Sequence, residues 1–275
     1  MSQYKTEEGS FRRADLAFPQ GGQTARSFRA AVLRMSTTDP DSTYATKGGT
    51  GSLGLLRYLI DNESCVIVGV QATAARMSQE TVAARDMITR FAQWQGRQPA
   101  SLAADTTYGN GAFLRWLLER DITPYMRTRD SIHRKKSPFY GPECFTYVPE
   151  SNSYRCPAGQ QLNYGGRSMR NRTYAYIGTR KRCGACSQKA QCTSGGFRYL
   201  AIHMDEPARQ RARELANTPE FADAQRQRKK VEALFAVKNQ IGLRRLRLRR
   251  LKFVREQFFL AAVAQNLKRL VRFLA

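Results

Sequence analysis

QRQRKKVEALFAVKN, the stretch from Gln225 to Asn239, contains neither Pro nor Gly and is rich in residues that favour helices. We therefore predict a helix over these residues. Glu232 is the only acid in the stretch and lies among Lys and Arg. Two interpretations of its carboxylate stay open: an ordinary ion pair with Arg228 one helical turn earlier, or a metal ligand held in a basic groove.

Composition sets the class of protein and of partner. The chain has 275 residues, of which 41% are hydrophobic, enough for one substantial domain or for a domain with an insertion. The formal net charge is +24 and the isoelectric point is near 10.4. A surface this basic attracts polyanions, so nucleic acid is the leading partner and an anionic membrane surface is the alternative.

The chain shows no sign of membrane insertion or export. No run of about 18 apolar residues occurs, and the first eight residues are polar, without the apolar core of a signal peptide. We therefore expect an intracellular, cytoplasmic protein. In a reducing compartment its six Cys favour metal or core roles over disulfides.

A hairpin and a helix are predicted in the first half of the chain. Leu53–Ile60 and Cys65–Ala72 resemble strands, and the turn sequence Asp61–Ser64 between them predicts an antiparallel pair. The second strand is apolar on both faces, which indicates a doubly covered strand with Cys65 as a buried thiol. Apolar residues at helical spacing predict a helix over 78–95.

Two acids in this half are candidates for chemistry. Asp39 precedes a Pro that forbids a central strand, so it belongs either to a polar turn or to the end of a first strand. Asp105 ends the predicted strand Ala100–Asp105, just before a predicted helix over Ala112–Glu119. Strand ends of this kind often carry functional groups, but a helix cap explains Asp105 equally well.

The segment 129–200 is rich in Arg, Gly, Tyr, Ser and Cys and has weak helical periodicity. Cys183 and Cys186 form a C-x-x-C pair, with Cys192 six residues later and Cys156 upstream. Four thiolates are a usual ligand set for structural zinc, and a segment poor in core residues needs such a site. Unliganded thiols are the alternative, and Cys144 is a possible substitute ligand.

The C-terminal part is strongly basic. From Ala224 to Ala275 there are fifteen Lys and Arg but only two acids. This imbalance favours contact with phosphates over an ordinary solvated surface. The candidate DNA-binding residues are Arg228, Lys229, Lys230, Lys238, Arg244, Arg245 and Arg247.

Six short motifs occur in an order and spacing that point to a family: Thr38–Asp41, Ala103–Gly109, Tyr154–Gly159, Cys183–Cys186, Arg226–Glu232 and Ala264–Arg269. From about Ser36 to the C-terminus the sequence resembles the DDE transposases of bacterial insertion sequences. The resemblance implies an α/β fold: a ribonuclease-H-like mixed sheet flanked by helices, with a Cys-rich insertion and a basic helical C-terminus.

The resemblance also implies a catalytic site. By position, Asp39, Asp105 and Glu232 match the three carboxylates that hold two Mg²⁺ or Mn²⁺ ions in the family. Asp41 and Asp61 are alternatives for the first. The implied activity is cleavage and transfer of DNA strands, with element ends and target DNA as partners, association with the nucleoid, and a homodimer as a candidate assembly.

The sequence departs from the family pattern in two places. Related transposases carry Tyr, Arg, Glu and Lys on one helix face, at −7, −4, 0 and +7 from the Glu. Here Gln225 replaces the Tyr, and Lys238 lies at +6, which rotates it by about 100° around the helix axis unless a bulge compensates. At the other end, residues 1–33 are too few for a DNA-binding domain with its own core.

The expected organisation has four parts. Residues 1–33 are an arm, the remnant of a missing DNA-binding region, and 34–128 are the first part of the catalytic core. Residues 129–204 are the Cys-rich insertion, and 205–275 complete the core and form the basic tail. The chain therefore resembles a truncated transposase; the alternatives are a non-catalytic zinc-containing DNA-binding protein and another ribonuclease-H-like nuclease.

Overall fold

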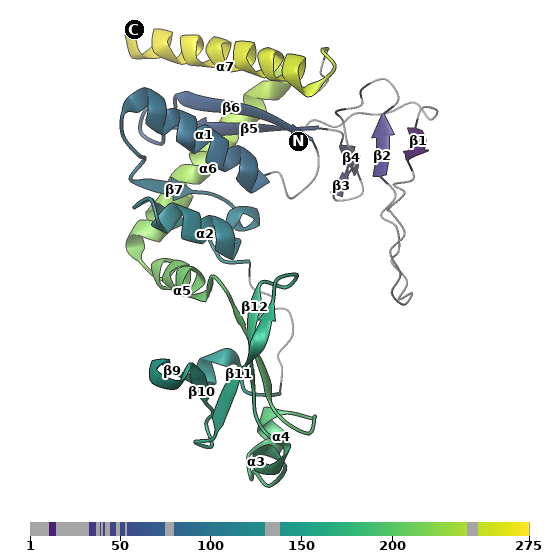
Figure 1. Cartoon of the computed structure of the whole chain (residues 1–275). Helices are drawn as coiled ribbons and strands as arrows, with labels where there is room; N and C mark the ends of the chain where they lie inside the picture. Colours follow the sequence, from purple (N-terminus) through teal and green to yellow (C-terminus); the bar gives the residue numbers. More distant parts are fainter. Residues whose placement is uncertain are drawn as a thin grey trace. The chain divides into compact units, whose positions relative to one another are not determined.

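The computed structural model describes residues 11–14, 33–36, 39, 41, 45–47, 50–52, 54–74, 80–129, 138–240 and 247–274, and of 11–14, 33–36, 45–47, 50–52, 54–56 and 230–240 it describes the backbone alone. The chain divides into two compact units, residues 1–103 with 222–275, and residues 104–221. Each unit is α/β, as the sequence predicts at the level of fold class (Figure 1).

The first unit is built on an antiparallel hairpin of β5 (Gly54–Ile60) and β6 (Ile67–Ala74). The helices α1 (Glu80–Gln95) and α7 (Leu251–Leu274) both pack against β6 (Figure 1). A Cβ on Gly69 would lie 3.5 Å from Met87 of α1, whereas Val70 packs in the cluster that α7 covers. Successive β6 residues therefore face different helices, which confirms a doubly covered strand.

The prediction for Cys65 was wrong. The strand begins at Ile67, and Cys65 is a half-buried residue of the preceding turn with a φ of 55°. Asp61 organises this turn, because its carboxylate accepts hydrogen bonds from the backbone N–H and the hydroxyl of Ser64. The hairpin itself is confirmed, with its turn where the sequence places it.

The remaining elements of the first unit are short strands and one long helix. β1 (Phe11–Ala14) pairs antiparallel with β2 (Leu33–Ser36), and β3 (Ala45–Lys47) pairs antiparallel with β4 (Thr50–Ser52). β7 (Ser101–Ala103) follows α1. The helix α6 spans Pro219–Gln240 and includes the whole of the predicted helix over 225–239.

The second unit begins with a helical part. A 3-10 turn η2 (Thr106–Tyr108) leads into α2 (Gly111–Leu118), which is followed by β8 (Thr123–Tyr125). α2 buries Phe113, Leu114 and Leu117 completely and packs against α5 (Glu206–Leu215). A Cβ on Gly111 would approach Asp205 Cβ to 2.9 Å, so this close packing requires glycine at the start of α2.

The Cys-rich segment contains the largest sheet. Five antiparallel strands follow the order β13-β12-β11-β10-β9, with β9 at Thr146–Val148, β10 at Ser153–Arg155, β11 at Gln161–Ser168, β12 at Thr173–Ile177 and β13 at Tyr199–His203. The short elements η4 (Pro142–Cys144), η5 (Pro149–Ser151), α3 (Arg180–Gly184) and α4 (Lys189–Cys192) complete it. Its own buried cluster includes Phe145, Leu162, Tyr176, Leu200 and Ile202, so the expectation of a segment poor in core residues was wrong.

Among the described residues, no helix is both long and apolar enough to cross a membrane.

Candidate carboxylate, DNA-binding and cysteine sites

Asp105 lies two residues after the end of β7, so the strand stops short of the predicted end at Asp105. Its side chain is exposed, and one carboxylate oxygen accepts a hydrogen bond of 2.8 Å from the backbone N–H of Thr107. Asp105 is thus the N-cap of η2. Of the two interpretations of Asp105, a cap or a functional carboxylate, the structure shows the capping hydrogen bond. The carboxylate of Asp105 is nevertheless accessible to solvent.

Asp39 and Asp41 both accept hydrogen bonds from backbone N–H groups in the first unit. An oxygen of Asp39 accepts a hydrogen bond of 3.2 Å from the backbone N–H of Arg250, and Asp41 accepts one of 3.1 Å from Leu251. These donors lie at the start of α7, where the first N–H groups have no partner within the helix. Two of the three candidates for the first catalytic carboxylate, Asp39 and Asp41, therefore bind the N-terminus of α7.

Glu232 lies in the second half of α6, but its side chain is outside the described residues. One turn earlier, Arg228 donates a hydrogen bond of 3.0 Å to the side chain of Gln225, the residue that replaces the family Tyr. α6 is continuous from Pro219 to Gln240. No bulge therefore compensates in this helix, and the backbone of Lys238 stays about 100° from the expected position around the axis.

The candidate carboxylates belong to different units. Asp39 and Glu232 are in the first unit, and Asp105 is in the second. Their common role as metal ligands remains a prediction.

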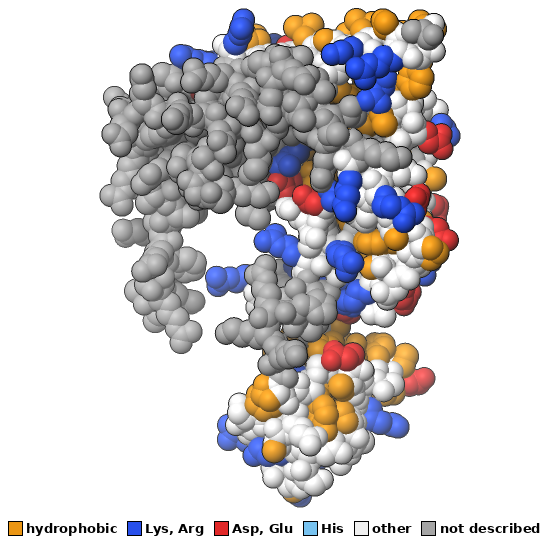
Figure 2. All heavy atoms as spheres, turned by 180° about the vertical axis from the view of Figure 1, so that it is seen from behind, with side chains coloured by type: hydrophobic (Ala, Val, Ile, Leu, Met, Phe, Trp, Pro, Cys, Tyr) orange, Lys and Arg blue, Asp and Glu red, His pale blue; other side chains and the backbone are white. Residues whose placement is uncertain are grey.

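Of the candidate DNA-binding residues, Lys229 and Arg247 are exposed and Arg228 is half-buried. Arg244 and Arg245 lie outside the described residues, as do the side chains of Lys230 and Lys238. Figure 2 shows separate groups of Lys and Arg side chains on one face of the described surface. DNA binding through these groups remains a prediction.

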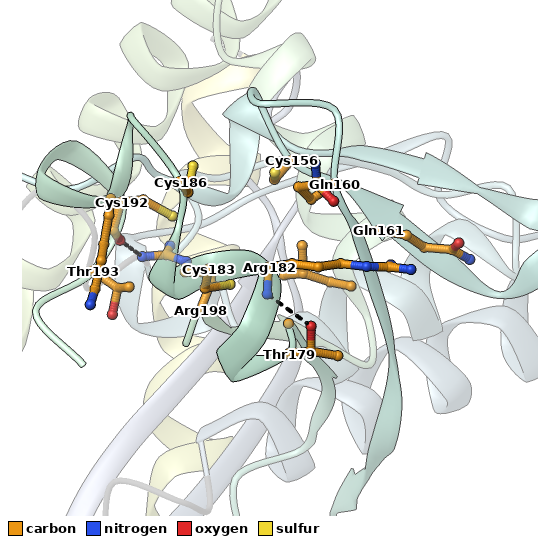
Figure 3. A pocket seen from close by; sticks show the side chains of 13 residues that line it. Cys156, Gln160, Gln161, Thr179, Arg182, Cys183, Cys186, Cys192, Thr193 and Arg198 are labelled. Carbon is orange, nitrogen blue, oxygen red and sulfur yellow. Dashed lines mark hydrogen bonds between the residues drawn. The ribbon is translucent and has the colours of Figure 1, made fainter. Parts of the chain in front are cut away.

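The four cysteines predicted to bind zinc line a single pocket in the second unit (Figure 3). Cys156 follows β10, Cys183 lies in α3, Cys186 follows it, and Cys192 ends α4. All are half-buried and none forms a disulfide. Cys144 is exposed and is not among the lining residues, so the structure gives no support to it as the substitute ligand.

Local backbone geometry positions these thiols. Cys156 sits in a tight turn, in which its carbonyl accepts a hydrogen bond of 2.8 Å from Gly159. The Cys183 sulfur packs so closely on Gly178 that a Cβ there would approach it to 2.7 Å. The cationic side chains of Arg182, Lys189 and Arg198 line the same pocket.

The pKa of Cys192 reflects the other thiols that line the pocket. Burial raises the pKa of Cys192, Arg198 opposes this effect, and the other three pocket cysteines raise the pKa further. Among the described residues, no three Cys, His, Asp or Glu side chains already stand in a metal-coordinating arrangement. The structure therefore shows four thiols sharing a pocket, and not a preassembled ligand set.

A buried ionic cluster is the feature that the sequence did not predict. The Asp205 side chain is fully buried, with one oxygen 2.9 Å from Arg172 Nη2 and the other 3.3 Å from Arg115 Nε. The backbone N–H of Asp205 donates a 3.0 Å hydrogen bond to His203 Nδ1. Burial, and then the charge of Arg209, lowers the pKa of His203.

This cluster joins separate elements of the second unit. Arg115 comes from α2, Arg172 precedes β12, and Asp205 precedes α5. Asp205 is the residue before α5, yet its side chain makes no capping hydrogen bond. The position of Asp205 before Glu206-Pro207 is typical of a helix start, and nothing local indicates its distant Arg partners.

Residues 155–271 match a family model described as the transposase DDE domain. The matched region contains Glu232 and the four pocket cysteines, and it does not reach Asp39 or Asp105. This match supports a DDE transposase, as the sequence motifs predict. No curated protein and no solved structure matches the chain.

Proposed function

We propose that the chain is a transposase that cleaves and transfers DNA strands of a bacterial insertion sequence, using a ribonuclease-H-like core. The observation that carries this proposal is the transposase DDE domain match over residues 155–271, which includes the helix that bears Glu232. The upstream motifs Thr38–Asp41 and Ala103–Gly109 support the same function. Its partners are then element ends and target DNA, in the cytoplasm with the nucleoid.

Asp39, Asp105 and Glu232 are the proposed metal ligands, with Asp41 as the alternative to Asp39. Carboxylate oxygens suit hard cations such as Mg²⁺ or Mn²⁺, and the exposed Asp105 carboxylate fits this requirement. When bound, a pair of such ions activates the attacking oxygen and stabilises the leaving oxygen of an in-line phosphoryl transfer.

Lys and Arg side chains of the chain are proposed to bind and position the DNA phosphates. The exposed Lys229 and Arg247 hold phosphates of the DNA backbone, which suits a chain with a net charge of +24. Arg228 is oriented by Gln225, which stands where relatives carry Tyr. Because Lys238 is rotated away from the expected face, we expect weaker phosphate positioning next to Glu232 and slow strand cleavage.

Nicking of supercoiled plasmid tests this function. Mg²⁺ should support nicking by the purified chain and EDTA should stop it. Asp105→Asn should abolish nicking while leaving DNA binding within about twofold, and Asp121→Asn, at an exposed position of the same unit, should nick as wild type does. Equal nicking by Asp105→Asn and the wild type would contradict the catalytic assignment.

Cys156, Cys183, Cys186 and Cys192 are proposed to hold one structural Zn²⁺. Their shared pocket supports this site, and its cationic side chains offset the negative charge of bound thiolates. Because thiols must lose protons to bind metal, zinc affinity should fall below neutral pH. Elemental analysis should find about one zinc per chain, retained in Cys144→Ser and lost when Cys183 and Cys186 are both Ser. A metal-free wild type would contradict the site.

A second function is favoured by the capping contacts. Asp39, Asp41 and Asp105 all bind backbone N–H groups, as they would in a non-catalytic zinc-containing DNA-binding protein. In that case the wild type would bind DNA and zinc but would not nick plasmid in Mg²⁺ or Mn²⁺.

A further inference from the structure

The five-stranded sheet of the second unit carries a layer of tyrosine rings on one face. Tyr147 of β9 is paired with Tyr154 of β10, and their ring centroids are 5.1 Å apart. Tyr164 of β11 is paired with Tyr176 of β12, at 5.8 Å. The rings of Tyr154 and Tyr176 are 4.7 Å apart, and Tyr174 lies 6.3 Å from Tyr164. Directly paired residues share a face of a sheet, so these five rings form one continuous layer, here called the tyrosine face.

The hydrophobic core accounts for only part of the tyrosine face. Tyr176 is 5% exposed and belongs to the buried cluster of the sheet, against which Tyr154 and Tyr174 pack. Tyr147 and Tyr164, by contrast, are 44% and 43% exposed. The hydroxyls of Tyr147 and Tyr176 each donate a hydrogen bond of 3.1 Å to the side-chain oxygen of Asn152, which fixes both rings. Two oriented aromatic rings therefore remain open to solvent beside the buried ones.

The charge around the tyrosine face indicates the kind of partner. Residues 138–204 contain nine Lys and Arg but only two acids. Arg167 is exposed and is paired with Tyr174, so it lies on the tyrosine face itself. Arg170 is exposed in the turn that follows β11. Cations beside oriented aromatic rings suit a ligand that has both phosphates and flat rings.

We propose that the tyrosine face binds an unpaired nucleic-acid strand, with bases stacked on Tyr147 and Tyr164 and a phosphate held by Arg167. In a duplex the faces of the bases are covered by their neighbours, so only an unpaired strand offers them to rings that lie on a sheet. Every base has such a face, and the site should therefore tolerate any sequence. This inference goes beyond the proposed function, because the contact needs neither the carboxylates nor a metal ion.

Fluorescence anisotropy of the full chain tests this binding, without added Mg²⁺ and at about 0.3 M NaCl, where purely ionic contacts weaken. The probes are labelled strands of about 20 nucleotides, one of DNA and one of RNA, and a DNA duplex of the same sequence. The wild type should bind the unpaired strands more tightly than the duplex. Equal affinities for the two strands would assign the contact to base faces alone, and a preference above about tenfold would identify the preferred strand as the ligand.

Substitutions of the two exposed rings separate stacking from general attraction to phosphates. Replacing Tyr147 and Tyr164 with Leu keeps apolar bulk but removes the rings. This change should weaken binding of the unpaired strands at least about tenfold and leave duplex affinity within about twofold. The matching double Phe variant retains both rings and should bind as the wild type does. Tyr199→Leu is the control on the opposite face: Tyr199 is 53% exposed, and its partner Ile177 adjoins Tyr176.

The salt dependence of binding tests the phosphate contact separately. Arg167→Gln should reduce the slope of log affinity against log salt by about 0.7 for the unpaired strands. Arg155→Gln should leave this slope unchanged, because the exposed Arg155 adjoins Tyr154 and lies on the opposite face. Circular dichroism verifies that the variants stay folded. A wild type that prefers the duplex, or unchanged strand binding in the double Leu variant, would overturn the proposal.

Discussion

The buried carboxylate of Asp205 gives a sharp test of how the second unit is held together. Asp205→Asn keeps the size of the side chain but removes its charge, so the loss of stability reports the ionic contacts and not a cavity. The 2.9 Å hydrogen bond from Arg172 is charge-assisted, and such bonds contribute about 1.5–3 kcal/mol. The Arg115 contact is longer, at 3.3 Å, and its side chain is 53% exposed, so it adds at most a few tenths of a kcal/mol.

We therefore expect Asp205→Asn to lower the free energy of unfolding by about 2–3 kcal/mol. Urea denaturation followed by Trp116 fluorescence measures this loss, because Trp116 lies on α2 and its ring is stacked 5.9 Å from that of Phe113. The only other tryptophan, Trp94, is replaced by Phe in all samples. The urea midpoint should fall by about 1 M or more.

The control for this experiment is Asp121→Asn. Asp121 is exposed, in the same unit, and has a φ of 57°, which Asn tolerates well. Its free energy of unfolding should change by less than about 0.5 kcal/mol. An equally small change in Asp205→Asn would refute the view that the buried ionic contacts stabilise the unit.

Two further predictions concern pH and the attachment of α7. Because the pKa of His203 is lowered in the folded chain, the unfolded chain takes up the proton more readily, so stability should fall as pH drops below about 6.5. His203→Gln should flatten the fall in urea midpoint between about pH 7.5 and 5.5, and an unchanged slope would contradict this cause. Asn266 bonds both the N–H and the C=O of Ile67 at 2.9 Å, so Asn266→Ala should lower the free energy of unfolding by about 2 kcal/mol. A loss below about 0.5 kcal/mol in thermal or urea unfolding would contradict that role.

Regular elements with strong periodicity could be predicted from the sequence. The β5–β6 hairpin follows from two apolar runs, the second rich in β-branched residues, around an Asp-Asn-Glu-Ser turn, and α6 follows from a long stretch without Gly or Pro. The sheet of the Cys-rich segment was missed because several of its strands have only three residues. An available signal was the alternation in Thr173–Ile177 and Tyr199–His203, where aromatic or aliphatic residues occupy every second position.

Contacts between residues far apart in the chain could not be predicted. The hydrogen bond from Arg250 to Asp39 spans 211 residues, and no local pattern indicates that Asp39 would bind the start of α7. Asp205 was missed for the same reason, because its Arg partners come from α2 and from the residue before β12. By contrast, the spacing of Cys156, Cys183, Cys186 and Cys192 was enough to indicate a group, and the structure places all four at one pocket.

The proposed function depends on Asp39, Asp105 and Glu232 binding the same metal ions. Mn²⁺ binding to the full chain, followed by electron paramagnetic resonance of free Mn²⁺, tests it most directly. We predict two Mn²⁺ per chain, and weaker binding by at least about tenfold in each of Asp39→Asn, Asp105→Asn and Glu232→Gln. Asp121→Asn, at an exposed position outside the proposed site, should bind as the wild type does. Unchanged Mn²⁺ binding in any of the three variants would contradict a common site for these carboxylates.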